Sequence, residues 1–562
     1  MKELVIVGLK KALNTLDIQV DAVKLEYPEN PEHGDFSSNA AMMYAKKLGM
    51  APKALAEKIA ASFKSDMPDE VQSVDIAGPG FINFTLKDKV FVDAAVGASE
   101  KGAMYGHSDT EKGRKVMVEY TQPNPFKQFH IGHLMNNAIG ESVSRLIEWN
   151  GSEVKRATYH GDVGLHVAKT IWALMKSGSA VDILGMGAAY AQGTAAYDTD
   201  AAAKEEIIEI NKKIYEHGDA AVNAVYDAGK KASLDYFESM YARLGSSFDF
   251  HFYESEAGII GKDIVLAFLK KSVFEESEGA VVFKGEQYGL HTRVFLNKEK
   301  LPTYEAKEIG LVEMKRSAFA FDQSITITAN EQDAFFKVVE CAIGKVFPDL
   351  AGELMHVSHG ILRLTSGKMS SRTGNIISAE SLIDDIRALV QEKMAGRGLE
   401  AVEQDEITDS IAIGAIKYTI LRQGIGGDVI FDSGASISFE GDSGPYLQYS
   451  AVRAGSILEK AKLEGVTYSS SNMVKPDKVG MLEKLISRFP DIIERARNEY
   501  SPQHVAGYLI DLAGAFNSFY ASQQIVDKND ALSPYYLALT QSFLTTMTNG
   551  LCVLGIKVPR KM

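Results

Sequence analysis

Two histidines separated by an Ile-Gly pair are the sharpest chemical feature of the sequence. Residues 130–133 read His-Ile-Gly-His, and Lys127 stands three positions before them. Imidazoles three positions apart at a helix start can face one ligand and donate hydrogen bonds to phosphoryl oxygens as charge develops. Gly132 removes a side chain where a planar base or a ribose could approach the backbone. The pattern predicts a phosphate site, although two surface histidines at a helix start would look the same in this tetrapeptide alone.

A second basic element follows much later in the chain. Residues 366–375 read Ser-Gly-Lys-Met-Ser-Ser-Arg-Thr-Gly-Asn, so glycines flank Lys368, two hydroxyls and Arg372. Such a stretch is typical of a flexible loop that binds phosphate through its cations and backbone N–H groups. Alone it could be any exposed turn, but together with the histidine pair it indicates one shared triphosphate.

The elements around the histidine pair predict how they are positioned. Residues 115–120 form a short apolar run that is typical of a strand buried on both faces. Pro123 and Pro125 end that strand, a helical pattern runs from about 132 to 150, and 154–158 reads as another strand. Strand, loop, helix and strand make a βαβ unit, which favours a doubly wound parallel sheet. The histidines then stand at a helix N-terminus, where unpaired N–H groups attract phosphate.

The remaining patterns divide the chain into parts. We expect an α/β protein, with a Rossmann-like doubly wound parallel-sheet core, an N-terminal α+β domain and an all-α C-terminal domain. The N-terminal part has helical patterns at 2–13 and 52–63 and a strand pattern at 81–86. The predicted boundaries are 1–105 for the N-terminal domain, 106–378 for the core with a helical insertion at about 175–255, 379–435 for a connecting helical segment, and 436–562 for the C-terminal helices.

Composition limits the class of protein further. The chain has 562 residues, 45% of them hydrophobic and 24% charged, and this is the composition of an ordinary globular protein without a membrane segment. The two cysteines, Cys341 and Cys552, have no partner at metal-ligand spacing, so we expect no structural metal, no disulfide framework and a cytoplasmic location. The net charge of −14 argues against a general nucleic-acid coat. Residues 451–562, however, carry 13 basic against 10 acidic side chains, so a local basic path is available.

These motifs together resemble a known family. A His-Ile-Gly-His sequence after the first strand of a doubly wound sheet, with Lys-Met-Ser-Ser-Arg at 368–372, is similar to the class I aminoacyl-tRNA synthetases. The wider context resembles arginyl-tRNA synthetases over essentially the whole chain. The matching segments are 32–36 and 77–82 in the N-terminal domain, 118–130 and 160–164 in the core, and 439–449 at the entry to the helical domain.

The resemblance implies a two-step reaction without a covalent enzyme intermediate. Arginine attacks the α-phosphate of ATP, and the arginyl group then passes from the adenylate to the terminal ribose of tRNA(Arg). Positioning and charge stabilisation must then do most of the catalysis. The implied catalytic residues are His130, His133, Lys127 and Lys368. Lys127 accompanies Ser371, which stands where many members have a second loop lysine. The implied ATP-binding residues are His130, Gly132, His133, Gly161, Asp162, Lys368, Met369 and Ser370.

Arginine recognition follows from the same resemblance. A guanidinium is planar and always charged, so a selective pocket needs carboxylates and a flat partner. Family positions imply that Glu119, Tyr304 and Glu308 bind the guanidinium, and that Asn124 and Gln332 hold the α-amino and carboxylate groups. Tyr304 and Glu308 share one face if their segment is helical. Departures from the family pattern affect the detail of these contacts: Glu308 stands for Asp, Met135-Asn136 for Arg-Ser, and Val163 and His166 for Trp and Gln.

Two alternatives and several expectations complete the prediction. One alternative is an enzyme with the same core and another amino acid, such as the lysine or cysteine enzyme. The other is a catalytically inactive RNA-binding relative. We expect ATP as a substrate accompanied by Mg²⁺, a monomer, no membrane partner, and an N-terminal domain that contacts tRNA. In the family, arginine activation usually requires bound tRNA, which is a hypothesis for this chain.

Overall fold

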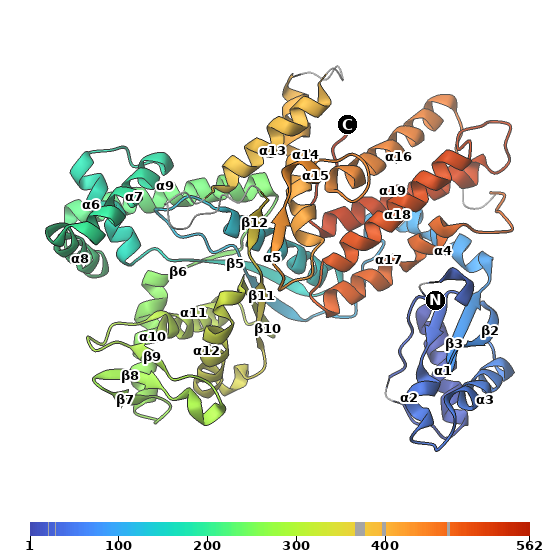
Figure 1. Ribbon diagram of the computed structural model, residues 1–562, viewed down its shortest axis with the longest axis horizontal. Coiled ribbons are helices and arrows are strands. Elements are labelled where there is room, and N and C mark those ends of the chain that lie inside the picture. The colour runs from blue at the N-terminus through green and yellow to red at the C-terminus, as the bar shows by residue number, and fades with distance from the viewer. Residues whose placement is uncertain (21, 29, 366–376, 396–400, 469–472) are drawn as a thin grey trace. The chain divides into compact units, whose positions relative to one another are not determined.

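The chain forms two compact units. The computed structural model describes residues 1–562 except 21, 29, 366–376, 396–400 and 469–472. The first unit comprises Met1–Lys101 with Glu464–Ser487 and Gln524–Ser542. The second comprises Gly102–Leu463 with Arg488–Gln523 and Phe543–Met562. Figure 1 labels the elements of both units.

The first unit contains a small mixed α+β fold. Its antiparallel sheet has the order β1-β3-β2, and Val5, Phe63 and Phe84 are fully or almost fully buried in its apolar core. The predicted helices at 2–13 and 52–63 and the predicted strand at 81–86 are confirmed. The elements are α1 (Lys2–Thr15), β1 (Phe36–Ser38), α2 (Ala40–Ala45), α3 (Pro52–Ser65), β2 (Val71–Ala77), β3 (Phe81–Leu86) and α4 (Asp88–Lys101).

A five-stranded parallel sheet forms the centre of the second unit. Its order is β11-β10-β4-β5-β6, and every neighbouring pair is parallel. The strands are β4 (Lys115–Glu119), β5 (Glu153–His160), β6 (Phe250–Tyr253), β10 (Gln323–Ala329) and β11 (Leu354–His359). The chain winds outward from β4 in one direction through β5 and β6, and from β10 in the other through β11. The crevice where β4 meets β10 is therefore the switch point at which such sheets bind ligands.

Helices and a small second sheet surround this core. The predicted βαβ unit is confirmed, since α5 (Ile131–Trp149) joins β4 to β5. The predicted insertion is also helical, and its helices pack against one another in the upper left of Figure 1. The elements between β5 and β11 are α6 (Leu165–Ser177), α7 (Ile183–Thr199), α8 (Ala201–Glu216), α9 (Ala220–Leu244), α10 (Glu254–Leu269), β7 (Glu275–Ser277), β8 (Ala280–Phe283), β9 (Arg293–Leu296), α11 (Tyr304–Ala318) and α12 (Asp333–Val346).

The last third of the chain is almost entirely helical, as predicted. The exception is a short parallel pair, β12 (Leu362–Leu364) with β13 (Val429–Phe431). Pro490 lies inside α17, which nevertheless continues through it. The helices are α13 (Ala379–Met394), α14 (Ala401–Leu421), α15 (Ser433–Ser436), α16 (Gly444–Glu464), α17 (Met481–Asn498), α18 (Gln503–Ser522) and α19 (Ser533–Val553).

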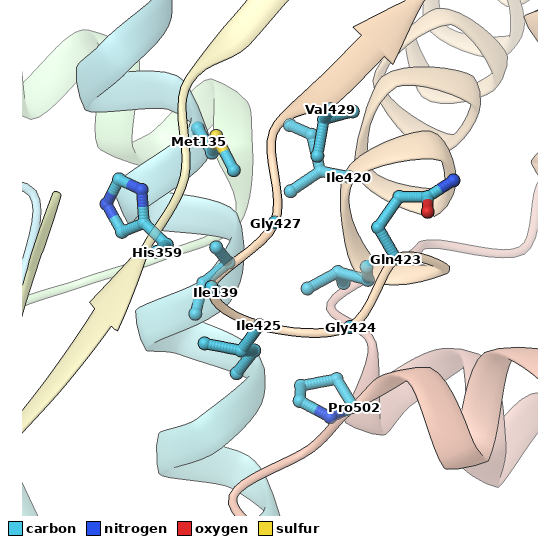
Figure 2. Close-up of a pocket in the computed structure, with 12 residues that line it drawn as sticks. Met135, Ile139, His359, Ile420, Gln423, Gly424, Ile425, Gly427, Val429 and Pro502 are labelled. Carbon is cyan, nitrogen blue, oxygen red and sulfur yellow. The ribbon is translucent and has the colours of Figure 1, made fainter. Parts of the chain in front are cut away.

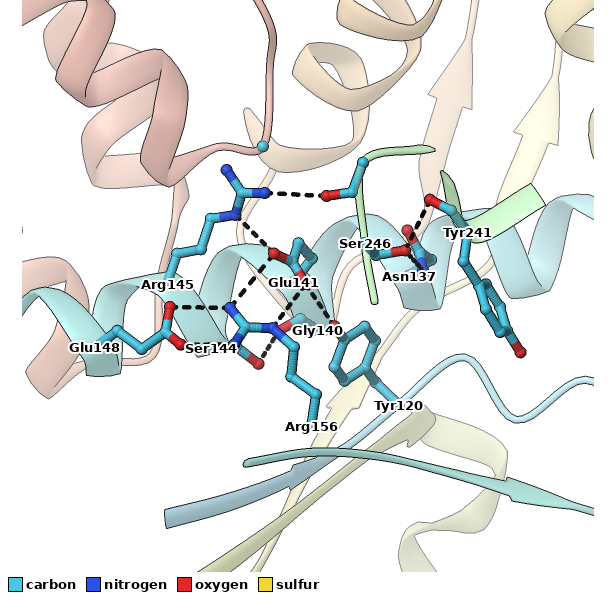
Figure 3. A network of polar contacts seen from close by, with 12 residues as sticks. Tyr120, Asn137, Gly140, Glu141, Ser144, Arg145, Glu148, Arg156, Tyr241 and Ser246 are labelled. Carbon is cyan, nitrogen blue, oxygen red and sulfur yellow. Dashed lines mark hydrogen bonds and ion pairs between the residues drawn. The ribbon is translucent and has the colours of Figure 1, made fainter. Parts of the chain in front are cut away.

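A buried network of charged side chains holds α5 against the central sheet. Glu141, in the middle of the helix, accepts hydrogen bonds from the Tyr120 hydroxyl, from Arg145 Nε at 2.7 Å and from Arg156 Nε at 3.0 Å. Figure 3 shows both guanidinium groups directed at this carboxylate. Arg145 also donates to the Cys552 carbonyl at 2.7 Å, so the network ties α5 to the end of the C-terminal helix. A charged group that is buried this deeply is stable only with such partners.

The loop after β4 adopts an unusual backbone. Thr121, Gln122 and Phe126 have positive φ angles of 74°, 49° and 65°, a region that residues other than glycine rarely occupy. Buried side chains hold this loop: Asn136 Oδ1 accepts from Thr121 N at 2.7 Å, and Ser233 Oγ accepts from Phe126 N at 2.9 Å. Strained backbone that its surroundings hold in place is characteristic of ligand sites.

Candidate active site

A cavity of about 600 Å³ opens at the carboxyl ends of the central strands. Glu119 ends β4, Thr328 and Ala329 end β10, and His359 ends β11. The lining also includes residues from α5, α10, α11 and the start of α12. The lining residues are Glu119, Thr121, Gln122, Asn124, His130, Gly132, His133, Asn136, Tyr159, Gly161, Glu254, Arg293, Tyr304, Glu305, Glu308, Thr328, Ala329, Glu331, Gln332, Phe335, Phe336 and His359.

The histidine pair caps the N-terminus of α5 reciprocally. His130 Nδ1 accepts from Gly132 N at 3.1 Å and from His133 N at 3.4 Å, while His133 Nδ1 accepts from His130 N at 3.2 Å. The rings are stacked, with centroids 3.6 Å apart. Because each Nδ1 is an acceptor, the proton of each neutral ring is on Nε2. Both rings therefore retain one N–H donor for a ligand at the positive end of the helix.

The environment keeps both imidazoles neutral. Burial, with Lys127 adding, lowers the pKa of His130 to about 4. Burial, His130 and Lys127 hold the pKa of His133 well below its usual value. Lys127 itself does not line the cavity, and its Nζ lies 5.0 Å from the centroid of the Tyr190 ring. Neutral donors suit a phosphate site because they add no charge that must be desolvated.

Another part of the cavity lining, its acidic end, carries carboxylates. Glu119 is 1% exposed, forms an ion pair with Lys315, and accepts from Gln122 Nε2 at 2.6 Å through its other oxygen. Glu308 is half-buried and lines the cavity beside it. Burial, with Glu119 adding, raises the pKa of Glu308 to about 8 although Lys315 opposes this. Two carboxylates therefore line this end of the cavity, and the Lys315 ammonium is buried behind one of them.

A second buried ion pair lies near the acidic end. Lys307 Nζ is 2.6 Å from Glu254 Oε2, and both side chains are largely buried. Tyr304 is 65% exposed at the start of α11, and Lys307 Nζ lies 5.2 Å from the centroid of its ring. Gln332 is exposed at the start of α12 and lines the cavity rim. Tyr304 and Gln332 are thus accessible to a ligand without rearrangement.

The predicted glycine–aspartate turn lies beside Asn124. Gly161 N donates to Asn124 Oδ1 at 3.0 Å, and a Cβ at Gly161 would lie only 2.5 Å from that oxygen. Asp162 does not line the cavity. It is fully buried and accepts from Tyr226 Oη at 2.9 Å, from Lys230 Nζ at 2.7 Å and from Ser255. Its carboxylate thus positions the turn, and its predicted role in ATP binding stays a prediction.

The two departures after the histidine motif have separate structural roles. Asn136 Nδ2 donates to the Ile327 carbonyl at 2.7 Å, so together with its contact to Thr121 it links the ends of β4 and β10. Met135 is buried and lines a narrow, mainly apolar cavity of about 10 Å³ with Ile139 and Ile425. Figure 2 shows this cavity with His359 at its edge, and His359 also lines the large cavity.

Sequence reasoning missed several residues of the site. Glu254, Arg293, Lys315 and His359 were not predicted, because each reads as an isolated polar residue in the sequence. Only their contacts in the fold show what these residues do. Arg293 contacts Glu305 at 3.0 Å, and His359 Nδ1 lies 2.8 Å from the Gly360 carbonyl. The predicted residues Lys368, Met369 and Ser370 lie outside the described residues.

A metal-binding cluster and a membrane-spanning helix are both absent from the described residues. Within them, no group of three or more His, Cys, Asp or Glu side chains converges in a way that could hold a metal ion. None of the helices, as far as the structure describes them, is both long and apolar enough to cross a membrane.

Comparisons with known proteins agree with this geometry. Residues 98–433 match the catalytic-domain model of class I tRNA synthetases of the arginine type, 3–86 match the arginyl-tRNA synthetase N-terminal domain, and 447–562 match the DALR anticodon-binding domain. The arginine–tRNA ligase of Flavobacterium psychrophilum is 30% identical over 516 residues, covering 86% of this chain and 85% of the relative. That of Streptococcus thermophilus is 29% identical over 572 residues, with 100% of each chain covered.

Solved structures show the same fold. The arginyl-tRNA synthetase of Thermus thermophilus is 22% identical, covers 100% of both chains and has a TM-score of 0.78. That of Plasmodium falciparum is 18% identical, covers 100% of this chain and 99% of that one, and has a TM-score of 0.80. Since the catalytic-domain model covers more than half of the chain, and the other two models cover its ends, the chain belongs to the arginyl-tRNA synthetase family of class I aminoacyl-tRNA synthetases.

Proposed function

We propose that the cavity at the switch point binds arginine at its acidic end and the ATP triphosphate at the start of α5. The chain is an arginine–tRNA ligase, which activates arginine with ATP and transfers it to tRNA. The observation that supports the proposal is that one cavity is lined both by the neutral histidine pair and by the acidic residues Glu119 and Glu308. The first step of the reaction requires both a site for phosphate and a site for a guanidinium group.

The proposed arginine contacts come from residues that line the cavity. Glu308 and Glu119 supply negative charge for the guanidinium, and Tyr304 supplies a flat ring at the rim. Asn124 and Gln332 receive the α-amino and carboxylate groups. This arrangement directs the substrate carboxylate toward the start of α5, where the α-phosphate must lie for attack.

The triphosphate contacts follow from the helix cap. His130 and His133 donate from Nε2 to phosphate oxygens on which charge develops, and Gly132 lets the nucleotide approach the backbone. Gly161 bounds the cavity near Asn124, while Asp162 positions the turn. Lys127 adds positive charge from the neighbouring loop, and Lys368, Met369 and Ser370, which lie outside the described residues, are also proposed to bind ATP. No general base is needed, since the attacking group is already a carboxylate.

Mg²⁺ is expected to come with ATP. The described residues offer no cluster of three ligands, and this fits an ion that is held mainly by phosphates and water. Its contribution would be to neutralise phosphate charge. We further propose that the enzyme acts as a monomer in the cytoplasm, and that activation requires bound tRNA.

The parts of the chain are proposed to divide the work. Residues 1–105 contact tRNA, 106–378 carry the chemistry, 379–435 connect the domains, and 436–562 bind the anticodon. A cluster on α16 and α18 is the proposed base-binding element: Arg453 lies 4.8 Å from the Tyr449 ring centroid and 5.3 Å from that of Tyr520, which is 45% exposed. Arg453 also donates to Asn517 at 2.6 Å, so its plane is held for stacking on unpaired bases.

Kinetics of two substitutions test the assignment of the cavity ends. Glu308→Gln keeps the shape and removes the charge, so it should raise KM for arginine at least about tenfold and leave KM for ATP nearly unchanged. His133→Asn should lower the rate of pyrophosphate exchange on the order of a hundredfold with little change in KM for arginine. Equal effects of each substitution on both substrates would contradict the assignment.

A further inference from the structure

A basic residue lies buried behind the acidic end of the cavity, and the proposed arginine contacts do not use it. Lys315 lies on α11, two turns after Glu308, and is only 2% exposed. Its ammonium group contacts one oxygen of Glu119 directly and lies 3.5 Å from Thr326 Oγ1. An ammonium group is costly to bury, and one that approaches a site for a cationic substrate also repels that substrate. Its position therefore requires an explanation beyond packing.

Charge balance at this end of the cavity gives that explanation. Glu119 is 1% exposed and is bound through one oxygen by Lys315 and through the other by Gln122. Glu308, in contrast, has no ion-pair partner within 4.0 Å among the side chains that the structure describes, and it lines the cavity. One ammonium thus compensates one of two neighbouring carboxylates. Among the described side chains, none lies within ion-pair distance of Glu308 to compensate the second carboxylate.

We propose that Lys315 is a positioning residue that neutralises Glu119, so that the arginine pocket presents a single net negative charge, at Glu308, to a single guanidinium. The inference rests on the proposed placement of arginine at this end of the cavity. It explains how two adjacent buried carboxylates can select a substrate with one positive charge without binding a second cation.

Arginine binding should change the protonation of Glu308. Burial and the neighbouring Glu119 raise the pKa of Glu308 to about 8, so the empty pocket holds a proton there at neutral pH. A bound guanidinium favours the ionised form, and arginine binding must therefore release close to one proton near pH 7. Since only the ionised pocket binds well, apparent affinity should rise roughly fiftyfold from pH 6 to pH 8.

Other ionisable groups also face Glu308. Tyr159 approaches from β5, Glu254 from α10 and Glu305 from α11. Glu340 on α12 lines a smaller cavity of about 20 Å³ behind Glu308, together with Lys315. Glu254 and Glu305 are paired with Lys307 and Arg293, at 2.6 Å and 3.0 Å. Lys315 is the cation that opposes the raised pKa of Glu308.

Calorimetry of arginine binding to the full-length enzyme tests the proposal. Titrations in buffers of different ionisation enthalpy give the number of protons released, and repeating them from pH 6 to pH 9 gives the midpoint of the pH dependence. Lys315→Met leaves Glu119 uncompensated beside Glu308, so the midpoint should move up by about one unit or more and affinity at pH 7 should fall about tenfold or more. Glu119→Gln removes the like charge, so the midpoint should move down.

The opposite directions of the two shifts separate the proposal from a general loss of packing. Lys337→Met makes the same change at an exposed position on α12 and should leave the midpoint unchanged. If Lys315→Met does not fold, the downward shift in Glu119→Gln still tests the idea. Midpoints that do not move, or that move in the same direction in both variants, would overturn it.

Glu308→Gln separates this inference from the site assignment. If Glu308→Gln weakens arginine binding and abolishes proton release while the other two variants leave the midpoint unchanged, only the role of Lys315 is wrong. If Glu308→Gln binds arginine as the unmodified enzyme does, the placement of arginine itself is wrong.

Discussion

A single substitution can separate the helix cap that His130 makes from its proposed role in binding phosphate. Its Nδ1 accepts from the backbone N–H groups of Gly132 and His133, at 3.1 Å and 3.4 Å, and so caps α5. Its Nε2–H remains available to donate to phosphate. Asparagine is among the best N-cap residues, and its Oδ1 can replace Nδ1 as the cap acceptor. Its side chain is too short to place a donor where Nε2 lies.

His130→Asn should therefore keep stability and lose activity. The cap contributes about 1 kcal/mol, so His130→Asn should leave the melting temperature almost unchanged, while His130→Ala should lower it by about one degree. The lost phosphate donor should reduce activation about 10²–10³-fold, equivalent to about 3–4 kcal/mol of transition-state stabilisation, in both variants. The stacking contact with His133 is lost in both and does not distinguish them.

Pyrophosphate exchange with arginine, ATP and tRNA measures the activation step, and thermal unfolding measures the cap. Exchange by His130→Asn within about twofold of the unmodified enzyme would show that the Nε2 donor does not act in activation. Equal melting temperatures of the alanine and asparagine variants would show that the reciprocal cap does not stabilise α5.

Four further predictions follow from the same contacts. Glu141→Gln should destabilise the second unit by about 3 kcal/mol, measured by urea unfolding, because Arg145 and Arg156 lose their shared buried carboxylate; unchanged stability would contradict the role of the network. Gly161→Ala should lower kcat/KM for arginine about tenfold or more at an unchanged melting temperature, since the new methyl group would displace Asn124, and an unaffected kcat/KM would refute this. Arg453→Ala should raise KM for tRNA about tenfold with unaltered KM for arginine, and a normal tRNA KM would exclude the α16–α18 cluster from binding. Burial lowers the pKa of Lys417 to about 7, so above pH 7 the unfolded chain binds a proton that the folded chain does not. The free energy of unfolding of the unmodified enzyme should therefore rise relative to that of Lys417→Met as the pH is raised from 7 to 9. Thermal unfolding of both proteins at each pH checks this.

The sequence predicted the elements that carry the site, but not the contacts that complete it. The strand before the histidine motif, the helix after it and the next strand follow from apolar runs and proline positions, and α5 begins one residue from its predicted start. The positive φ angles of Thr121, Gln122 and Phe126 could not be predicted, because buried partners such as Asn136 and Ser233 impose them from far along the chain.

Charged residues illustrate the same limit. Lys315 and Glu254 read as ordinary helical charges in the sequence, yet each forms a buried ion pair in the cavity wall. The resemblance implies that Asp162 binds ATP, which stays a prediction, and the structure adds that its carboxylate accepts from Tyr226, Lys230 and Ser255. Pairing across the fold decides whether a charge is available to a ligand, and a single sequence does not contain that information.

A crystal structure of the enzyme with arginine, a non-hydrolysable ATP analogue and tRNA would test the central claim most directly. The account predicts the guanidinium against Glu308, with Lys315 still paired to Glu119, and the triphosphate within hydrogen-bond distance of Nε2 of both His130 and His133. A guanidinium bound elsewhere in the cavity, or phosphates that do not contact the histidine pair, would contradict it.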